Sequence, residues 1–302
     1  MLNCWQYASS QKIEIGSMEP EKKKGGASVA LRWLTAIILM PIVLLFVWFG
    51  GWAAFVAITA VVVLGLYELS TMLRHAGYRP LLWVSLGLAL LFLVAAMFPL
   101  HQLLILEIGI AVLLMLSFCC FYFRKNLDGA LVDWALTLAS ALYLGWPMSF
   151  FLLLRGMQPG RVIPLMVPAG TWWLLVTLLG VWGFDAAAFF AGRYFGRHKL
   201  APTISPAKTW EGVLGGLILS VIASLLCTVV PLGVPWYVAI LLGICIGVFA
   251  TLGDLAESLL KRQTRVKDSG QIMPGHGGML DRIDSLLFAI MVVFIFAQFF
   301  VK

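Results

Sequence analysis

The residues of this chain best suited to chemistry lie close together between Gly253 and Asp284. Asp254, Ser258 and Lys261 are spaced at i, i+4 and i+7, so in a helix they share one face. That face offers a carboxylate, a hydroxyl and an ammonium group side by side. Groups of these kinds hold metal ions and phosphates.

A second polar face follows, formed by Asp281, Asp284 and Ser285 at i, i+3 and i+4. The residues between the two faces turn tightly or bring backbone close to a ligand: Gly270, Pro274, Gly275, Gly277 and Gly278. Two acid-bearing helices joined by a glycine-rich, basic turn favour a metal held by carboxylates, with phosphates held by amides and cations. The alternative is a solvated loop between membrane spans, but ionisable groups at a span boundary more often mark function.

Another polar cluster precedes these faces. Asp185 lies within an apolar run, roughly 10 Å deep at the helical rise. A carboxylate there needs a cation or a partner, and a structural salt bridge to a neighbouring span is the alternative. Ser205 and Lys208, just before another apolar run, offer a hydroxyl and an ammonium group suited to phosphate. The basic residues between them are interpreted as interfacial anchors: Arg193, Arg197 and Lys199.

The sequence as a whole is that of a polytopic membrane protein. Of its 302 residues, 62% are hydrophobic and 12% are charged, and runs long enough to cross a bilayer recur. The pattern predicts an all-α fold with nine spans, at 30–49, 52–73, 81–99, 102–123, 131–154, 170–191, 211–230, 236–255 and 285–301. We expect one transmembrane catalytic domain, residues 29–302, with site loops 192–210 and 256–284, preceded by a disordered cytoplasmic extension, residues 1–28.

Charge placement predicts the orientation. With the N-terminus in the cytoplasm, nine spans put all 21 basic residues on that side except Arg155, Arg161 and Lys302. The net charge of +7 is therefore attributed to topology and anionic ligands, and not to nucleic acid. The five cysteines show no metal-binding spacing.

Three other ionisable residues call for comment. Glu68, near the cytoplasmic end of its span, is either a site carboxylate or a protonated packing residue, and the sequence leaves both open. Glu107 is interpreted as structural. His276 is the one histidine of the sequence inside a dense motif.

The segment from Ser258 to Asp284 resembles the signature of the phosphatidate cytidylyltransferases, or CDP-diacylglycerol synthases. Its matching positions are Ser258, Lys261, Arg262, Lys267, Asp268, Gly270, Pro274, Gly275, His276, Gly277, Gly278, Asp281, Arg282 and Asp284. The blocks around Asp185 and from Ser205 to Gly212 resemble the upstream motifs of this family, in the same order. Two departures are Ala186, where a hydroxyl residue is common, and Phe189, where Tyr is common.

This resemblance implies an all-helical integral membrane enzyme that converts CTP and phosphatidate to CDP-diacylglycerol and pyrophosphate. It implies Mg²⁺, with a second, monovalent cation, usually K⁺. It further implies a bacterial inner membrane with the site facing the cytoplasm, and it leaves a homodimer open.

The roles that we expect combine the resemblance with the residue types. The metal ligands are Asp254 and Asp281, with Asp284 or Asp268 completing the shell and Asp185 as a further ligand. The residues expected to contact substrate are Ser205, Lys208, Ser258, Lys261, Arg262, Lys267, Asp268, His276, Gly277, Gly278 and Arg282. The residues expected to act in catalysis are Asp281, Asp284, Lys261 and Lys208.

Two other functions compete with this one. A CTP-dependent lipid-alcohol kinase is disfavoured by the complete block from His276 to Asp284. A transporter for an anionic solute is disfavoured because transporters usually keep their ionisable groups near the midplane, whereas most of these lie at one face.

Overall fold

The helices of this chain follow its apolar runs, as expected of backbone that must satisfy its hydrogen bonds internally in lipid. The computed structural model describes residues 40–123, 127–157, 167–270 and 277–300. After a first helix at Met40–Phe49, the elements are α2 (Gly51–His75), α3 (Leu82–Met97), η1 (Pro99–His101), α4 (Gln102–Tyr122), α5 (Ala130–Arg155), α6 (Ala169–Phe195), β1 (Lys199–Ala201), β2 (Ser205–Thr209), α7 (Trp210–Leu232), α8 (Trp236–Gln263) and α9 (Leu280–Phe300).

The all-α, polytopic prediction is confirmed. Within the described residues, each of the nine predicted spans corresponds to one α-helix. Seven helices in this part of the chain are long and apolar enough to cross a membrane, and Met40–Phe49 and Leu82–Met97 are shorter apolar helices. The predicted extension 1–28 lies outside the described residues.

The first two helices are separate, as predicted. Arg155, at the end of α5, donates from Nε to the Val47 carbonyl (2.7 Å) and from Nη2 to the Trp48 carbonyl (2.8 Å). These carbonyls belong to the last turn of the first helix, where no backbone N–H of that helix can donate to them. A cation at a helix C-terminus also complements the helix dipole.

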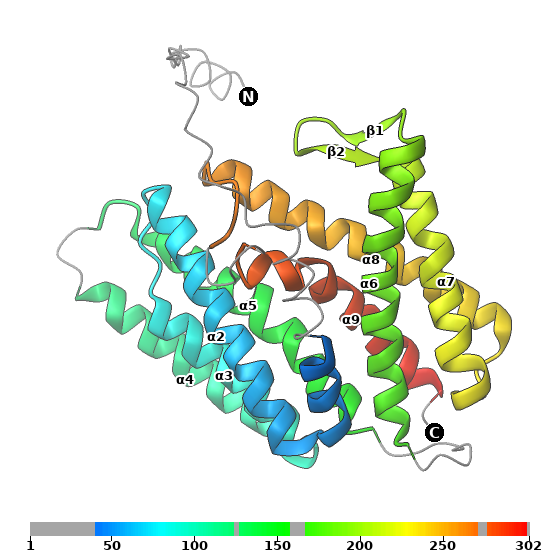
Figure 1. The fold of residues 1–302 in the computed structure, drawn as a ribbon. Helices are drawn as coiled ribbons and strands as arrows, with labels where there is room; N and C mark the ends of the chain where they lie inside the picture. The colour runs from blue at the N-terminus through cyan, green and yellow to red at the C-terminus, as the bar shows by residue number, and fades with distance from the viewer. Residues whose placement is uncertain (1–39, 124–126, 158–166, 271–276, 301–302) are drawn as a thin grey trace, which may run out of the picture.

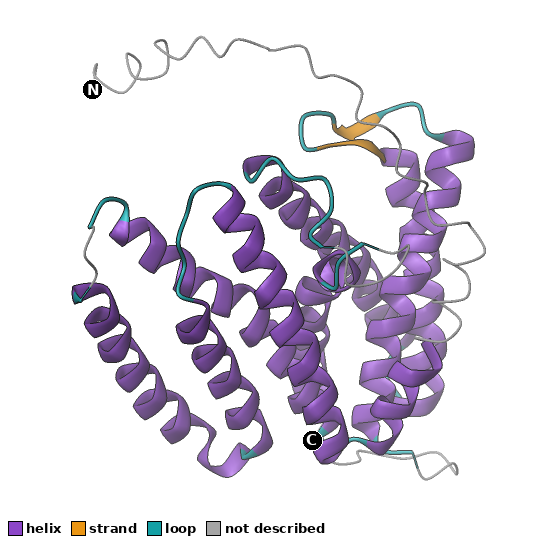
Figure 2. Cartoon of the chain, turned by 60° about the vertical axis from the view of Figure 1, so that its left-hand side comes forward, coloured by secondary structure: helices purple, strands orange, loops and turns teal. Residues whose placement is uncertain are grey.

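The predicted site loops are shorter in the structure, because three helices continue past their apolar runs. Helix α6 runs to Phe195, α8 runs to Gln263 and α9 begins at Leu280. Apolar content alone predicts where a helix crosses lipid, whereas these charged ends extend beyond that stretch. Between α6 and α7 lies an antiparallel two-stranded hairpin, β1–β2 (Figure 2, orange), which was not predicted from the sequence.

The helices pack in a bundle with α9 near its middle (Figure 1). Helix α6 packs along α7, α8 along both α7 and α9, and α3 along α5. The core between the helices contains fully buried side chains, among them Leu66, Leu144, Trp173, Ile246 and Leu287. Helix α4 is peripheral, since Ser117 and Phe121 are its only buried residues.

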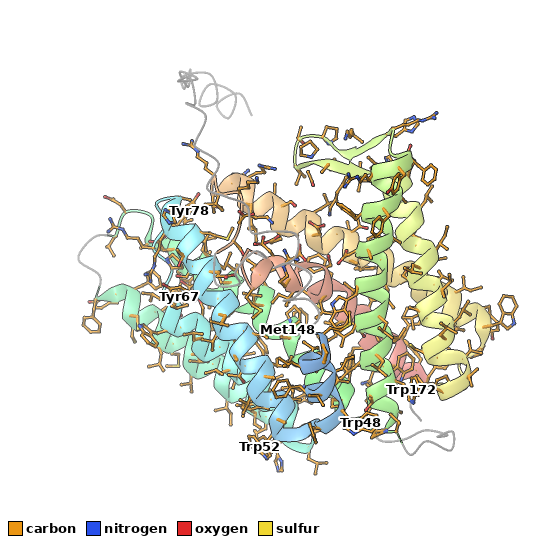
Figure 3. All side chains as sticks on the ribbon, viewed as in Figure 1. Trp48, Trp52, Tyr67, Tyr78, Met148 and Trp172 are labelled. Carbon is orange, nitrogen blue, oxygen red and sulfur yellow. The ribbon has the colours of Figure 1, made fainter. Side chains whose placement is uncertain are left out.

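Aromatic side chains lie at both ends of the bundle. Figure 3 shows Trp48, Trp52 and Trp172 at one end and Tyr78 at the other. The hairpin and the C-terminal end of α8 lie at the same end as Tyr78. Aromatic side chains at both ends are typical of membrane interfaces.

Candidate active site

Lys261 of α8 binds one carboxylate on its own helix and one on α9. Its Nζ atom lies 2.8 Å from Asp281 Oδ1 and 2.5 Å from Glu257 Oε2. Glu257 is completely buried, and buried charge is tolerated when it is paired. Glu257 was not among the site residues predicted from the sequence. Its i, i+4 spacing to Lys261 was the signal that would have identified it.

The other oxygen of Asp281 organises the loop before α9. Oδ2 accepts hydrogen bonds from Gly278 N (2.9 Å), Ser269 N (3.1 Å) and Ser269 Oγ (3.0 Å). Residues from both halves of the signature segment therefore meet at Asp281.

Glu68 of α2 also binds this loop. Its Oε1 accepts a hydrogen bond from Met279 N (2.9 Å), and its Oε2 accepts from Leu280 N (2.9 Å) and Ser269 Oγ (3.1 Å). These amides are among the free donors at the start of α9. Of the two interpretations left open by the sequence, the geometry favours a carboxylate at the site. No local pattern could have indicated its partners, which lie 211 and 212 positions along the chain.

The upstream cluster reaches the same region through the hairpin. Lys208 of β2 forms an ion pair with Asp254 of α8 (2.7 Å), and Ser258 Oγ lies 3.3 Å from Asp254 Oδ1. Thr209 ends the hairpin and caps α7, since its Oγ1 accepts from Gly212 N at 3.2 Å. Arg262 Nε donates to the Ile204 carbonyl (3.1 Å), which ties the hairpin turn to α8.

Acids on three helices interact electrostatically with one another and with Lys208 of this ion pair. Asp185 of α6 interacts electrostatically with Asp254 and Asp284, and with the cations Lys208 and Arg282. Asp284 is buried and accepts a hydrogen bond from Ser285 N (2.6 Å). The arrangement joins carboxylates from α6, α8 and α9 with a lysine from the hairpin.

Comparison with known proteins agrees with the motifs. The sequence pattern of the cytidylyltransferase family matches residues 30–300. The chain belongs to the cytidylyltransferase family.

Several bacterial proteins named phosphatidate cytidylyltransferase are similar to this chain along most of its length. A phosphatidate cytidylyltransferase from Synechocystis is 34% identical over 302 residues, covering 88% of this chain and 95% of the relative. The enzyme of that name from Pseudomonas aeruginosa is 38% identical, covering 86% and 94%. That from Brucella suis is 33% identical, covering 91% and 96%. The family resemblance seen in the motifs is thus confirmed.

The other predicted site residues differ in their exposure to solvent. Ser205, on β2, is half-buried, and Gly277 precedes the buried Gly278. The exposed ones are Arg262, Lys267, Asp268 and Arg282. His276 lies outside the described residues. The roles assigned to these residues stay predictions.

The predicted metal ligands are all carboxylates. No group of three or more His, Cys, Asp or Glu side chains in the described ranges is already arranged to hold a metal. In chemistry, however, the carboxylates of Asp185, Asp254 and Asp284 suit a hard divalent cation, which would relieve their mutual repulsion. Asp281 suits it less well, because four donors already surround its two oxygens. The acids are therefore of the kind that binds a divalent cation. On binding it, Asp254 would give up its ion pair with Lys208.

Proposed function

We propose that this chain is a phosphatidate cytidylyltransferase, which transfers the cytidylyl group of CTP to phosphatidate in phospholipid biosynthesis. The observation that carries the proposal is the convergence of the two polar clusters, seen in the 2.7 Å ion pair between Lys208 and Asp254. Family membership and the names of the relatives support it.

In this reaction two polyanions must meet. A phosphate oxygen of phosphatidate forms a bond to the α-phosphorus of CTP, and the bond from that phosphorus to the bridging oxygen of the β-phosphate breaks, releasing pyrophosphate. Like phosphoryl transfer, this nucleotidyl transfer depends on positioning and charge stabilisation, and it needs no covalent intermediate. Lys208 and Lys261 are the half-buried cations that would bind the phosphates. The backbone at Gly277 and Gly278 would approach them closely.

We further propose that Mg²⁺ takes part. When bound, it would neutralise charge on the phosphates of CTP. Asp254, Asp284 and Asp185 would hold it, and the monovalent cation implied by the resemblance would use the same acidic region. Asp281 would keep the loop before α9 in place through Ser269 and Gly278.

The orientation is part of the same proposal. A site facing the cytoplasm gives CTP access from water and phosphatidate access from the bilayer. The placement of basic residues on one side supports it. A bacterial inner membrane agrees with the bacterial relatives. The mass of the purified protein in detergent tests for the homodimer that the resemblance leaves open.

The position of a phosphorus label tests the reaction. Purified protein is incubated with phosphatidate, Mg²⁺ and CTP that is labelled at either the α- or the γ-phosphorus. We expect the α-label in the chloroform-soluble product, only when phosphatidate is present, and the γ-label in pyrophosphate. Transfer of the γ-label to a lipid alcohol would instead identify a kinase. Uptake of an anionic solute into vesicles, with neither label in lipid, would identify a transporter.

A further inference from the structure

Glu68 is the least expected member of the site. It lies on α2, 201 positions before Ser269, and it is 2% exposed. Its carboxylate nevertheless accepts hydrogen bonds from two backbone amides of the α9 region and from the Ser269 hydroxyl. A buried carboxylate with three donors is a strong anchor, since hydrogen bonds to a charged group are shorter and stronger than neutral ones.

The loop is shaped to fit around this carboxylate. A Cβ atom at Gly278 would lie 2.5 Å from Glu68 Oε2, and a Cβ atom at Gly270 would also collide with the Glu68 side chain. Only glycine lets the backbone come so close at these two positions. The backbone at Gly270 and the backbone at Gly278 therefore both lie against Glu68.

Ser269 connects this anchor to Asp281. Its Oγ atom lies 3.1 Å from Glu68 Oε2 and 3.0 Å from Asp281 Oδ2. The hydroxyl has one proton and so donates to one carboxylate at a time. Ser269 N holds Asp281 as well, at 3.1 Å. A movement of Glu68 would consequently shift Ser269, and with it Asp281 and the lysine that Asp281 binds.

We propose that Glu68 is a positioning residue of the active site. It would hold the first turn of α9 and, through Ser269, set the positions of Asp281 and Lys261 relative to the phosphates. This inference rests on the proposed function, because it assigns Glu68 a part in that reaction. Glu68 of α2 would thus support a reaction whose other expected site residues lie on α6, α8, α9 and the hairpin.

The test compares Glu68→Gln, Ser269→Ala and the double variant, in full-length purified protein. Glutamine keeps the size of Glu68 but offers one acceptor oxygen and directs an NH₂ group at backbone donors. Misplacement of reacting groups by a remote change costs on the order of 100-fold. We expect about that loss in kcat, with KM for CTP changed by less than about threefold. For Ser269→Ala we expect about a tenfold loss, the size of one hydrogen bond to a charged group.

Because Glu68 acts through Ser269, the double variant should lose no more than Glu68→Gln alone. Glu107→Gln on the exposed α4 is the matched control and should behave as wild type. Hydrogen–deuterium exchange gives a readout independent of turnover. The peptide that contains Met279 and Leu280 should exchange at least about tenfold faster in Glu68→Gln, while peptides of α4 are unchanged.

The outcomes separate this inference from the proposed function. If the wild-type protein makes no lipid product, the proposed function fails, and exchange at Met279 and Leu280 still tests the contact. If the wild type is active but Glu68→Gln keeps kcat within about threefold, the positioning role is wrong. Multiplying losses in the double variant would overturn the connection through Ser269. If Glu68→Gln does not fold, Ser269→Ala decides the matter. A kcat equal to that of the wild type would overturn the proposal, and a loss of about tenfold would support it.

Discussion

Lys208 and Asp254 form an ion pair at 2.7 Å between a β-hairpin and a membrane helix. The hairpin follows α6 and the helix is α8, so the pair joins two segments separated by all of α7. As the chain stands, Lys208 neutralises one of the acids expected to bind the metal. When substrate and metal bind, the Lys208 ammonium would contact a phosphate and the Asp254 carboxylate would contact the metal ion.

The first prediction is that Lys208→Ala lowers kcat/KM for both substrates by about thirty- to a thousand-fold. An ammonium that stabilises charge shifting onto pyrophosphate contributes on the order of 2–4 kcal/mol. The assay uses purified, folded protein, with Lys199→Ala of the exposed strand end as the control. A loss under about threefold, equal in the two variants, would exclude Lys208 from the site.

The second prediction distinguishes Asp281 from Asp284. Asp281→Asn should lower turnover at least about 100-fold at every Mg²⁺ concentration, because it disrupts the contacts to Lys261, Ser269 and Gly278. Asp284→Asn should instead raise the Mg²⁺ concentration needed for half-maximal activity, since a hard cation prefers charged oxygen ligands. Rates measured across a Mg²⁺ titration give the answer. A Mg²⁺ requirement raised by Asp281→Asn would make Asp281 a metal ligand.

The third prediction concerns stability. Lys261→Met leaves Glu257 buried without its cation, and loss of one partner from a buried pair costs about 3–5 kcal/mol. We expect a lower unfolding temperature in detergent, partly restored when Glu257→Gln is added. Lys267→Met, on an exposed loop, is the control and should unfold as the wild type does. An unchanged unfolding temperature for Lys261→Met would show that the pair contributes nothing to folding.

The fourth prediction concerns orientation. In a variant without the native cysteines, Arg265→Cys should react with an impermeant thiol reagent only from the cytoplasmic side. Trp236→Cys, at the other end of α8 and exposed, should react only from outside. Both are scored in intact cells and in inverted vesicles. Labelling of position 265 in intact cells would reverse the proposed topology.

The sequence by itself determined the class of the fold and the segments that carry the chemistry. Apolar runs of membrane length predict helices, and spacing within one helix places Asp254, Ser258 and Lys261 on a common face without knowledge of any neighbour. The same local reasoning failed at helix ends, where α8 and α9 continue past their apolar runs, and at the hairpin that carries Lys208.

Only the tertiary structure decided which helices lie beside which, and so which charges pair. It paired Lys208 with Asp254, bound Asp281 to Ser269, and brought Glu68 to amides more than two hundred positions away. The reason is physical: the position of one side chain relative to another in the same helix follows from the helical repeat, whereas contacts between helices follow from packing. The need to give each buried charge a partner then selects among those contacts, and this selection depends on every helix at once.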